Sequence, residues 1–423
     1  MAMNAKVEMH PQIRERGAEQ DAPSMPHAAA ATKRVAMSLP LAPAMRIGKH
    51  AIVNQIKGGK YPLVLMLEPL LRCNLACKGC GKIDYPDAIL NRRLSYEQCM
   101  EAIEESGAPA VSIAGGEPLL HRDMPRIVEG YLERKKFVIL CTNALLLKKK
   151  IDEYKPHSFF TWSIHLDGDK VMHDKAVCQD GVYDTALEAV DLALAKGFRV
   201  QVNCTVFNDA DPARLASFLD LMATKGVETT ISPGYAYERA ADQEHFLNRE
   251  RTKNLFRDLL RRGAESKKRV GRKWKFTNSP LFIDFLAGNQ SYECTPWSMP
   301  LRTVFGWQKP CYLVGEGYVG TFRELMEGTD WDDYGVGKYE KCSNCMVHCG
   351  FEGTAASDAL RRPWEFVRLA LTGVDTEKPM VPDIDLSNAR KAVDMHEEEV
   401  GKQMERIKVE DPEGFRRASR AAA

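Results

Sequence analysis

From residue 61 onward, short apolar runs alternate with amphipathic segments, the order expected of strands that are each followed by a helix. The amphipathic segments predict helices over 95–106, from about 124, and over 183–195, 212–225 and 244–262. The first of these should begin with a capping box, with Ser95 as N-cap and Gln98 at the third helical position. Six apolar runs have the length of buried strands: 63–70, 110–114, 137–141, 159–166, 200–207 and 228–232. Six strand–helix units in series predict an α/β fold whose parallel sheet curls into a partial (β/α)6 barrel.

The pattern changes toward both ends of the chain. Residues 1–36 are rich in alanine, proline and charge, which predicts a disordered extension. Residues 37–60 predict a helical segment, with a helix over 44–57 that mixes basic and isoleucine side chains. That helix rests either on a membrane surface or, as we favour, on the protein itself. The remainder divides into a core over 61–267, a smaller Cys-rich domain over 268–360 and a charged helical tail over 361–423.

Composition narrows the class of protein. A formal net charge of +1 disfavours general nucleic-acid binding, which needs a basic surplus. The start of the chain lacks the apolar core of a secretory signal, and no apolar run reaches the roughly 20 residues that span a bilayer. We therefore expect a cytoplasmic protein, in which 12 cysteines indicate metal binding or catalysis rather than disulfides.

Three cysteines follow the first predicted strand directly. Cys73, Cys77 and Cys80 have the spacing C-x3-C-x2-C, at the strand end where sites lie in such folds. Three thiolates bind three irons of a [4Fe–4S] cube and leave the fourth iron open to a small chelating molecule. The amino and carboxylate groups of S-adenosylmethionine (SAM) suit that position, and an electron from the cluster then splits SAM into methionine and a 5′-deoxyadenosyl radical. The alternatives are a zinc site, for which no fourth ligand stands close by, and free core cysteines.

The second predicted strand ends in Gly115-Gly116-Glu117-Pro118. Two glycines allow close approach of the backbone, Glu117 accepts hydrogen bonds from an ammonium group, and Pro118 opens the next helix. The cysteine spacing and this Gly-Gly-Glu-Pro segment together resemble the radical SAM superfamily, in which the second motif binds the SAM amino group. One position departs from that family, because Gly79 stands where many members have an aromatic residue.

The resemblance also implies SAM contacts at later strand ends. The fourth strand offers Ser163, His165 and Asp167 for the ribose and carboxylate of SAM. Further candidates are Asn203 and Thr205 on the fifth strand and Ser232, followed by Pro233, at the end of the sixth. Each of these residues has an alternative role as a helix cap or turn residue.

Longer segments resemble a narrower family, the hopanoid-associated adenosylhopene transferases (adenosylhopane synthases). The resemblance runs from about 37 to 370 and rests on 61–70, 80–90, 141–147, 292–297, 305–307 and 339–349. It implies that the adenosyl radical adds to the terminal alkene of diploptene, with SAM as a co-substrate. It further implies a low-potential electron donor such as flavodoxin or ferredoxin, no nucleic-acid partner, and peripheral contact with the inner face of the cell membrane.

Cys141 ends the third strand, at the same predicted rim as the cluster loop. The tertiary carbon radical left by the addition needs a hydrogen atom from a weak bond, and a thiol S–H provides one. We therefore expect Cys141 to be the hydrogen donor, in line with a thiol at the matching position of the family. The alternative is a buried core cysteine. We expect Cys99, Cys178 and Cys204 to be core or incidental cysteines.

A second group of cysteines lies in the C-terminal part. Cys342-x2-Cys345-x3-Cys349 has ligand spacing, and with Cys294 and Cys311 it predicts a second Fe–S cluster or a zinc site rather than free thiols. The aromatic residues of the same region form either a pocket for a polycyclic hydrocarbon or an ordinary core: Trp274, Trp297, Phe305 and Trp307. A peptide-modifying radical SAM enzyme with an auxiliary cluster, or a non-catalytic metal-binding scaffold, is the competing interpretation.

Overall fold

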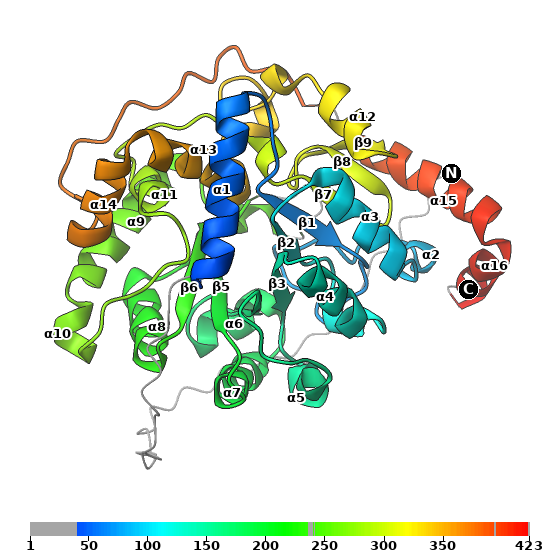
Figure 1. Cartoon of the computed structure of the whole chain (residues 1–423), viewed down its shortest axis with the longest axis horizontal. Coiled ribbons are helices and arrows are strands. Elements are labelled where there is room, and N and C mark those ends of the chain that lie inside the picture. The colour runs from blue at the N-terminus through cyan, green and yellow to red at the C-terminus, as the bar shows by residue number, and fades with distance from the viewer. Residues whose placement is uncertain (1–39, 236–239, 241, 393–394, 422–423) are drawn as a thin grey trace. The chain divides into compact units, whose positions relative to one another are not determined.

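The computed structural model describes residues 40–235, 240, 242–392 and 395–421, so the extension predicted over 1–36 lies outside the described residues. One sheet organises this part of the chain, with the strand order β6-β5-β4-β3-β2-β1-β7-β8-β9. The six predicted parallel strands are confirmed: β1 Val64–Glu68, β2 Ala110–Ile113, β3 Phe137–Thr142, β4 Phe160–His165, β5 Val200–Val206 and β6 Glu228–Pro233. They stand side by side in the middle of Figure 1.

Helices follow the strands as the apolar pattern predicted. Those of the core are α2 Asp87–Leu90, α3 Tyr96–Ser106, α4 Met124–Glu133, α5 Leu147–Lys150, α6 Lys170–Val177, α7 Val182–Ala195, α8 Pro212–Lys225, α9 Arg249–Ala264, α10 Ser266–Val270 and α11 Pro280–Leu286. The predicted capping box is present, because Gln98 N donates to Ser95 Oγ and Ser95 N donates to Gln98 Oε1. Helix α9 begins five residues later than predicted, where the side chain of Asn248 caps it.

Parallel register brings the predicted site residues to one edge of the sheet. Cys141 on β3 pairs with Ser163 on β4, and His165 pairs with Asn203 on β5. Thr205 in turn pairs with Ser232 on β6. Since parallel strands end at the same edge, these residues converge near the loop that follows β1.

Three more strands extend the sheet beyond β1. Strand β7 Leu301–Thr303 pairs in parallel with β1. Strand β8 Gly306–Pro310 pairs antiparallel with β7, and β9 Gly315–Val319 pairs antiparallel with β8. The apolar pattern did not predict these strands, which are three to five residues long and, in β8 and β9, interrupted by glycine and polar residues. The domain boundary expected near residue 268 stays a prediction. The first strand after that residue, β7, belongs to the same sheet as the core strands.

The aromatic residues of this region belong to the core and do not form a hydrocarbon pocket. Trp307 is buried against Phe322, Phe305 packs on Tyr318, and Trp297 packs on Trp331. Trp274 Nε1 donates a hydrogen bond to Asp220 on α8. The polycyclic pocket considered for these four side chains is therefore not formed by them.

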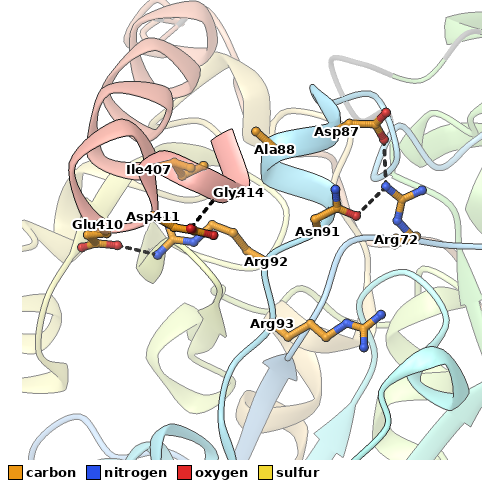
Figure 2. A pocket seen from close by; sticks show the side chains of 10 residues that line it. All are labelled: Arg72, Asp87, Ala88, Asn91, Arg92, Arg93, Ile407, Glu410, Asp411 and Gly414. Atoms are coloured by element: carbon orange, nitrogen blue, oxygen red, sulfur yellow. Dashed lines mark hydrogen bonds and ion pairs between the residues drawn. The ribbon is translucent and has the colours of Figure 1, made fainter. Parts of the chain in front are cut away.

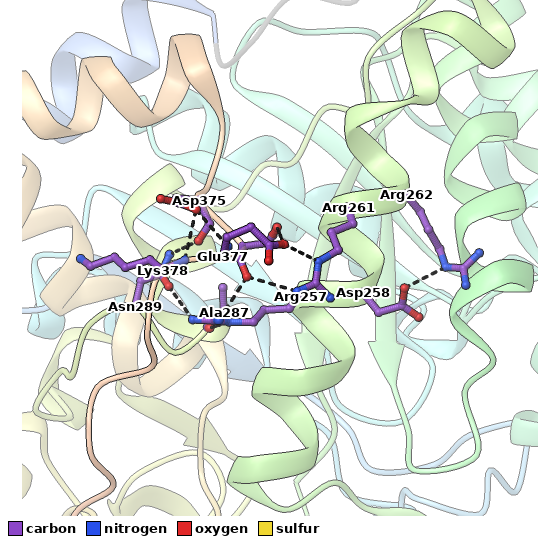
Figure 3. A network of polar contacts seen from close by, with 10 residues as sticks. Arg257, Asp258, Arg261, Arg262, Ala287, Asn289, Asp375, Glu377 and Lys378 are labelled. Carbon is purple, nitrogen blue, oxygen red and sulfur yellow. Dashed lines mark hydrogen bonds and ion pairs between the residues drawn. The ribbon is translucent and has the colours of Figure 1, made fainter.

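The C-terminal part wraps back over the core. Its helices are α12 Phe322–Glu327, α13 His348–Arg361, α14 Pro363–Thr372, α15 His396–Glu410 and α16 Pro412–Ala421. The extended segment 373–383 runs from α14 past α9 and is held there by a network of polar contacts (Figure 3). Buried Arg257 is central to it, because its guanidinium donates to Ala287 O at 2.7 Å, Asn289 Oδ1 at 2.8 Å and Thr376 O at 3.1 Å.

Helix α1, Leu41–Lys57, packs beside α13 and buries only a narrow stripe of its surface (Figure 1). Pro43 and Ala51 are buried, whereas several of its large apolar side chains face solvent: Leu41, Met45, Ile52, Val53 and Ile56. Among the described residues, no helix combines the length and apolar character needed to cross a membrane.

Candidate active site

A cavity of about 290 Å³ opens at the carboxyl edge of the sheet. Almost every residue predicted from the sequence lines it: Cys73, Cys77, Cys80, Gly115, Gly116, Glu117, Pro118, Cys141, His165, Asp167, Asn203, Thr205, Ser232 and Pro233. Ser163 and the five C-terminal cysteines are the predicted residues that do not line it. Ser163 is buried next to the cavity, where its hydroxyl accepts a hydrogen bond from Gln201 Nε2 at 3.3 Å and contacts the thiol of its strand partner Cys141.

The cysteine loop is tied to the end of β3 through Asn143. The Asn143 side chain donates to Asn74 Oδ1 at 2.7 Å and lies 3.8 Å from Cys73 Sγ. The cysteine loop is also held by a backbone hydrogen bond, in which Lys78 N donates to Ala176 O on α6 at 3.1 Å. Sequence reasoning missed Asn143, although its position two residues after Cys141 was a usable signal.

The two glycines after β2 lie directly against the backbone of the cysteine loop. Gly116 N donates to Leu70 O and Glu117 N donates to Arg72 O. A Cβ atom at Gly115 would collide with Leu70 O, and one at Gly116 would collide with Arg72 O. Gly115 also has φ +105°, which a side chain rarely tolerates. The cysteine loop after β1 and the glycine segment after β2 therefore form one continuous wall of the cavity.

Glu117 is buried and already fully engaged within the protein. Its carboxylate accepts hydrogen bonds from Leu119 N, Thr142 Oγ1 and Asn143 N at 2.8–3.0 Å. Burial raises the pKa of Glu117, which these hydrogen bonds partly offset. The carboxylate thus fixes the end of β3 against the glycine loop, and its predicted contact with the SAM ammonium stays a prediction. Pro118 does open a helix, but a single 3₁₀ turn, and α4 follows at Met124.

His165 and Asp167 form an ion pair at the end of β4. Their Nε2 and Oδ2 atoms are 2.7 Å apart, and Asp167 Oδ1 accepts from Thr205 N at 2.8 Å. Burial disfavours both charges, but the attraction between them outweighs it, so the pKa of His165 is raised and that of Asp167 is lowered. The pair fixes the ends of β4 and β5 relative to each other.

A partly buried lysine, Lys82, links the cysteine loop to the C-terminal part. Lys82 Nζ lies 3.0 Å from the carboxylate of Glu68, the last residue of β1, and 4.8 Å from the ring centre of Tyr312. Neither Glu68 nor Lys82 was singled out from the sequence. The position of Glu68 at the end of a buried strand could have indicated a partner, because burial of an unpaired carboxylate costs free energy.

Aromatic rings supply the other side of the cavity. Phe207, at the end of β5, stacks on His245 and reaches within 3.1 Å of the position that a Cβ of Gly79 would take. Phe246 packs against the same glycine. The volume that an aromatic residue at position 79 would fill is thus filled by rings from elsewhere in the chain. Tyr312, Leu313 and Val347 complete this apolar side.

Cys141 presents its thiol to the same cavity, with Ser112 Oγ 3.7 Å away. Burial raises the pKa of Cys141, so the side chain is a protonated thiol near neutral pH. A thiol that carries its hydrogen is the form required of a hydrogen-atom donor.

The donor set fits a [4Fe–4S] cluster. Cys73, Cys77 and Cys80 line one cavity, and burial raises the pKa of Cys73 to about 11, with those of Cys77 and Cys80 raised as well. Their ionisation therefore needs the compensating charge of bound iron. Besides these thiols, the cavity has polar groups at its strand ends that suit an amino-acid ligand.

The structure also gathers all five C-terminal cysteines. They line one small chamber, which shares three wall residues with the active-site cavity: Tyr235, Tyr312 and Leu313. Cys99 and Cys204 are buried in the core and Cys178 is exposed, as expected of incidental cysteines.

A larger cavity, of about 650 Å³, lies away from these residues, between α2 and the C-terminal helices (Figure 2). Two of the arginines that line this cavity form hydrogen bonds with neighbouring side chains of the protein. Arg72 donates to Asp87 and Asn91, and Arg92 donates to Glu410. It contains none of the predicted site residues, so its size does not indicate an active site.

Comparison with known proteins gives two family matches. Residues 67–222 match the Radical SAM superfamily, and residues 229–369 match a domain of unknown function, DUF3463. The pre-heme d1 synthase of Dinoroseobacter shibae is 23% identical over 69% of this chain and 74% of its own length. A probable GTP 3′,8-cyclase of Methanococcus maripaludis is 22% identical over 62% of this chain and 89% of its own.

Solved structures agree on the fold. Streptococcus suis SuiB superposes with a TM-score of 0.54 and 16% identity, over 71% of this chain and 74% of that one. Its SAM-bound form matches with a TM-score of 0.48 and 15% identity, over 58% of this chain and 59% of that one. The match with a TM-score of 0.54, at 16% identity, shows a common fold alone.

Proposed function

We propose that this radical SAM enzyme, whose superfamily domain spans residues 67–222, adds the 5′-deoxyadenosyl group to the terminal alkene of diploptene to form adenosylhopane. The observation that carries the proposal is the Cys141 thiol, which opens into the same cavity as the three cluster cysteines and the apolar rings. The sequence resemblance to the adenosylhopene transferases supports the choice of substrate.

Each half of the cavity suits one reactant. Cys73, Cys77 and Cys80 would hold the cluster, and the polar strand ends with Asn203 and Thr205 would bind SAM. When bound, the cluster and SAM supply a 5′-deoxyadenosyl radical. The side that carries Phe207, Phe246 and Leu313 offers no charge to a hydrocarbon and keeps water from the reacting carbon.

Cys141 completes the reaction by hydrogen-atom transfer. Addition of the adenosyl C5′ to the alkene terminus leaves a tertiary carbon radical on the substrate, which takes the hydrogen atom of the Cys141 S–H bond. The thiyl radical left on Cys141 returns to a thiol by uptake of one proton and of one electron from a low-potential donor such as a flavodoxin or ferredoxin. Ser112, next to Cys141, helps to fix the thiol at the cavity wall.

Helix α1 supports peripheral contact with a membrane, from which an apolar triterpene must be taken. Its exposed Leu41, Met45 and Ile56 stand among basic side chains, Arg46 and Lys49, a combination that suits an anionic lipid surface.

Product analysis tests the proposal directly. Anaerobically reconstituted protein would be incubated with SAM, a strong reductant and diploptene, and the products identified by mass spectrometry. We expect adenosylhopane. Formation of 5′-deoxyadenosine without the adduct would point instead to another radical SAM reaction, such as peptide modification, and absence of both would contradict enzymatic SAM cleavage.

Replacement of the thiol tests the role of Cys141. We expect Cys141→Ala to lower the yield of adenosylhopane at least about tenfold, a loss of about 1.4 kcal/mol or more in the transition state. In D2O the wild type should place one deuterium at the tertiary carbon, because thiol hydrogens exchange with solvent. Cys204→Ala, in the buried core, is the matched control. Unchanged yield and stereochemistry in Cys141→Ala would refute the donor role.

A further inference from the structure

We infer that the C-terminal cysteines bind a second [4Fe–4S] cluster, in the chamber that adjoins the active-site cavity. Two segments far apart in sequence supply the thiols: Cys294 and Cys311 from one, and Cys342, Cys345 and Cys349 from the other. The inference goes beyond the proposed function, because it concerns metal content and holds for any substrate.

The two segments are joined directly at the chamber. Thr295 N donates to Gly350 O at 2.8 Å, which places Cys294 against the first turn of α13. A Cβ on Gly350 would lie 2.7 Å from Cys294 Sγ, so only glycine leaves room for this thiol. The fold therefore maintains the approach of the two cysteine segments by specific backbone contacts.

The polar surroundings of the sulfurs suit a negatively charged ligand set. Cys349 is the second residue of the 14-residue helix α13, where free backbone N–H groups and the helix dipole favour negative charge. Val314 N donates a hydrogen bond to Cys311 Sγ at 3.3 Å. Hydrogen bonds from backbone N–H groups to cysteine sulfur are characteristic of Fe–S sites, where they tune the cluster.

The arrangement favours a cluster over a single zinc ion. Zinc draws its thiolates to about 2.3 Å from one point, which brings the sulfurs close together. Among the residues that the structure describes, no three His, Cys, Asp or Glu side chains converge closely enough to hold one metal ion. Cys73, Cys77 and Cys80 do not converge on one point either. A [4Fe–4S] cube spreads its ligands over separate corners, so the C-terminal cysteines can be compared with these three predicted cluster ligands.

The chamber is also protected and firmly attached to the core. Apolar side chains, including Met299, Val336 and Phe351, close it against water. Buried Arg249 on α9 donates to Cys345 O at 3.1 Å, and Tyr235 OH donates to Lys341 O at 2.8 Å. Four thiolates complete the coordination of a cube, so we expect Cys342, Cys345 and Cys349 to be ligands and either Cys294 or Cys311 to be the fourth.

Iron analysis of anaerobically reconstituted full-length protein tests the inference without any activity assay. We expect about eight iron and eight sulfide per chain in the wild type, two cubes of four. Cys73→Ala/Cys77→Ala/Cys80→Ala should retain about four iron, and so should Cys345→Ala/Cys349→Ala, with Mössbauer spectra typical of [4Fe–4S] in both. Cys99→Ala/Cys204→Ala, which changes two core cysteines, should keep the wild-type content.

Three results would overturn the inference: about four iron in the wild type, an iron-free Cys73→Ala/Cys77→Ala/Cys80→Ala protein, or one zinc per chain bound by the C-terminal cysteines. The N-terminal triple variant leaves the chamber intact, so the test stands even if Cys345→Ala/Cys349→Ala fails to fold. Absence of adenosylhopane would count against the proposed function alone, because these readouts do not depend on a substrate.

Discussion

Buried polar residues at the strand ends do most of their work by positioning the residues that face the cavity. Glu117 accepts two hydrogen bonds from the segment at the end of β3, from Thr142 Oγ1 and Asn143 N, and a third from Leu119 N. Asn143 in turn holds the cysteine loop through Asn74. The three sequence motifs, the cysteine loop, the glycine loop and the Cys141 segment, therefore form one connected unit. Loss of one of these contacts is therefore expected to destabilise the others.

Gly116 provides a sharp test of that connection. In Gly116→Ala the new Cβ meets the backbone carbonyl of Arg72, which has no side-chain freedom to move away. We expect a loss of about 3 kcal/mol in the free energy of unfolding and loss of SAM binding, measured by chemical denaturation and equilibrium dialysis.

Gly48→Ala is the control for that substitution, since Gly48 lies in α1 and, apart from the helix's own neighbouring backbone, no atom stands within 4 Å of the position that its Cβ would take. It should raise the unfolding free energy by about 0.5–1 kcal/mol. Normal SAM binding by Gly116→Ala would show that the glycine loop and the cysteine loop are not coupled.

The His165–Asp167 pair predicts a pH dependence of stability. The raised pKa of His165 contributes stability that is complete below its unfolded value, about 6.5, and is lost as the pH rises through its folded value. The lowered pKa of Asp167 contributes stability above about 3.9 that is lost at lower pH. Asp167→Asn should therefore cost most between about pH 4 and 6.5, roughly 2–3 kcal/mol, and less at pH 9.

Urea unfolding of the wild type and Asp167→Asn at pH 5.5 and pH 9 measures this difference. Asp184→Asn is the control, because Asp184 pairs with Lys170 at an exposed position and should cost at most about 0.5 kcal/mol at either pH. An equal loss at both pH values would mean that His165 is not charged in the folded protein.

Among the elements, α9 connects the core to the C-terminal segment 373–383 through two arginines of different burial. Arg257 is buried and satisfies three acceptors, whereas Arg261 is half exposed and pairs with Glu377. Both contact the same segment (Figure 3). A comparison of Arg257 with Arg261 therefore shows how much burial adds to the stabilisation that an arginine gives to segment 373–383.

We expect Arg257→Leu to lower the free energy of unfolding by about 3 kcal/mol, because it leaves buried carbonyl and amide oxygens without donors. Arg261→Leu, one helical turn further on, should cost about 0.5 kcal/mol. Denaturation curves compare the two, and limited proteolysis should cut segment 373–383 faster only in Arg257→Leu. Equal losses in both variants would contradict the ranking by burial.

At the scale of the whole molecule, the proposed contact with a membrane rests on the exposed face of α1. One stripe of the helix packs on the protein at Pro43 and Ala51, and the exposed remainder presents Ile52 and Ile56. The two interpretations of this helix are thus compatible, because packing uses one face and leaves apolar and basic side chains on another.

Vesicle binding tests this surface. We expect Ile52→Glu/Ile56→Glu to lower partition onto vesicles with one-third anionic lipid about tenfold, since each loses buried apolar area and gains charge repulsion. Val171→Glu, at an exposed apolar position on α6, is the control and should bind like the wild type. Binding should also weaken in 0.5 M salt, because screening reduces the attraction of the basic residues. Unchanged binding of the double variant would exclude α1 as the contact.

Sequence pattern alone predicted the parts of the protein that depend on local order. The strand–helix alternation, the capping box at Ser95 and helix α8 follow from periodicity and local hydrogen bonds, which need no distant partner. The cysteine spacing after β1 predicts a cluster site, because three candidate ligands lie within one loop. His165, Asn203 and Thr205 line the same cavity as these cysteines, because parallel strands end at a common edge.

Tertiary structure decided everything that joins distant segments. Pairing of β7 with β1, the burial of Glu117 and the replacement of a ring at Gly79 by Phe207 all arise from contacts between residues far apart in the chain. The sequence grouped Cys294 and Cys311 with Cys342, Cys345 and Cys349 as candidate ligands, and the tertiary structure brings all five to one chamber. Local patterns determine which elements form, whereas the gathering of side chains depends on how the elements pack, a long-range property that periodicity does not encode.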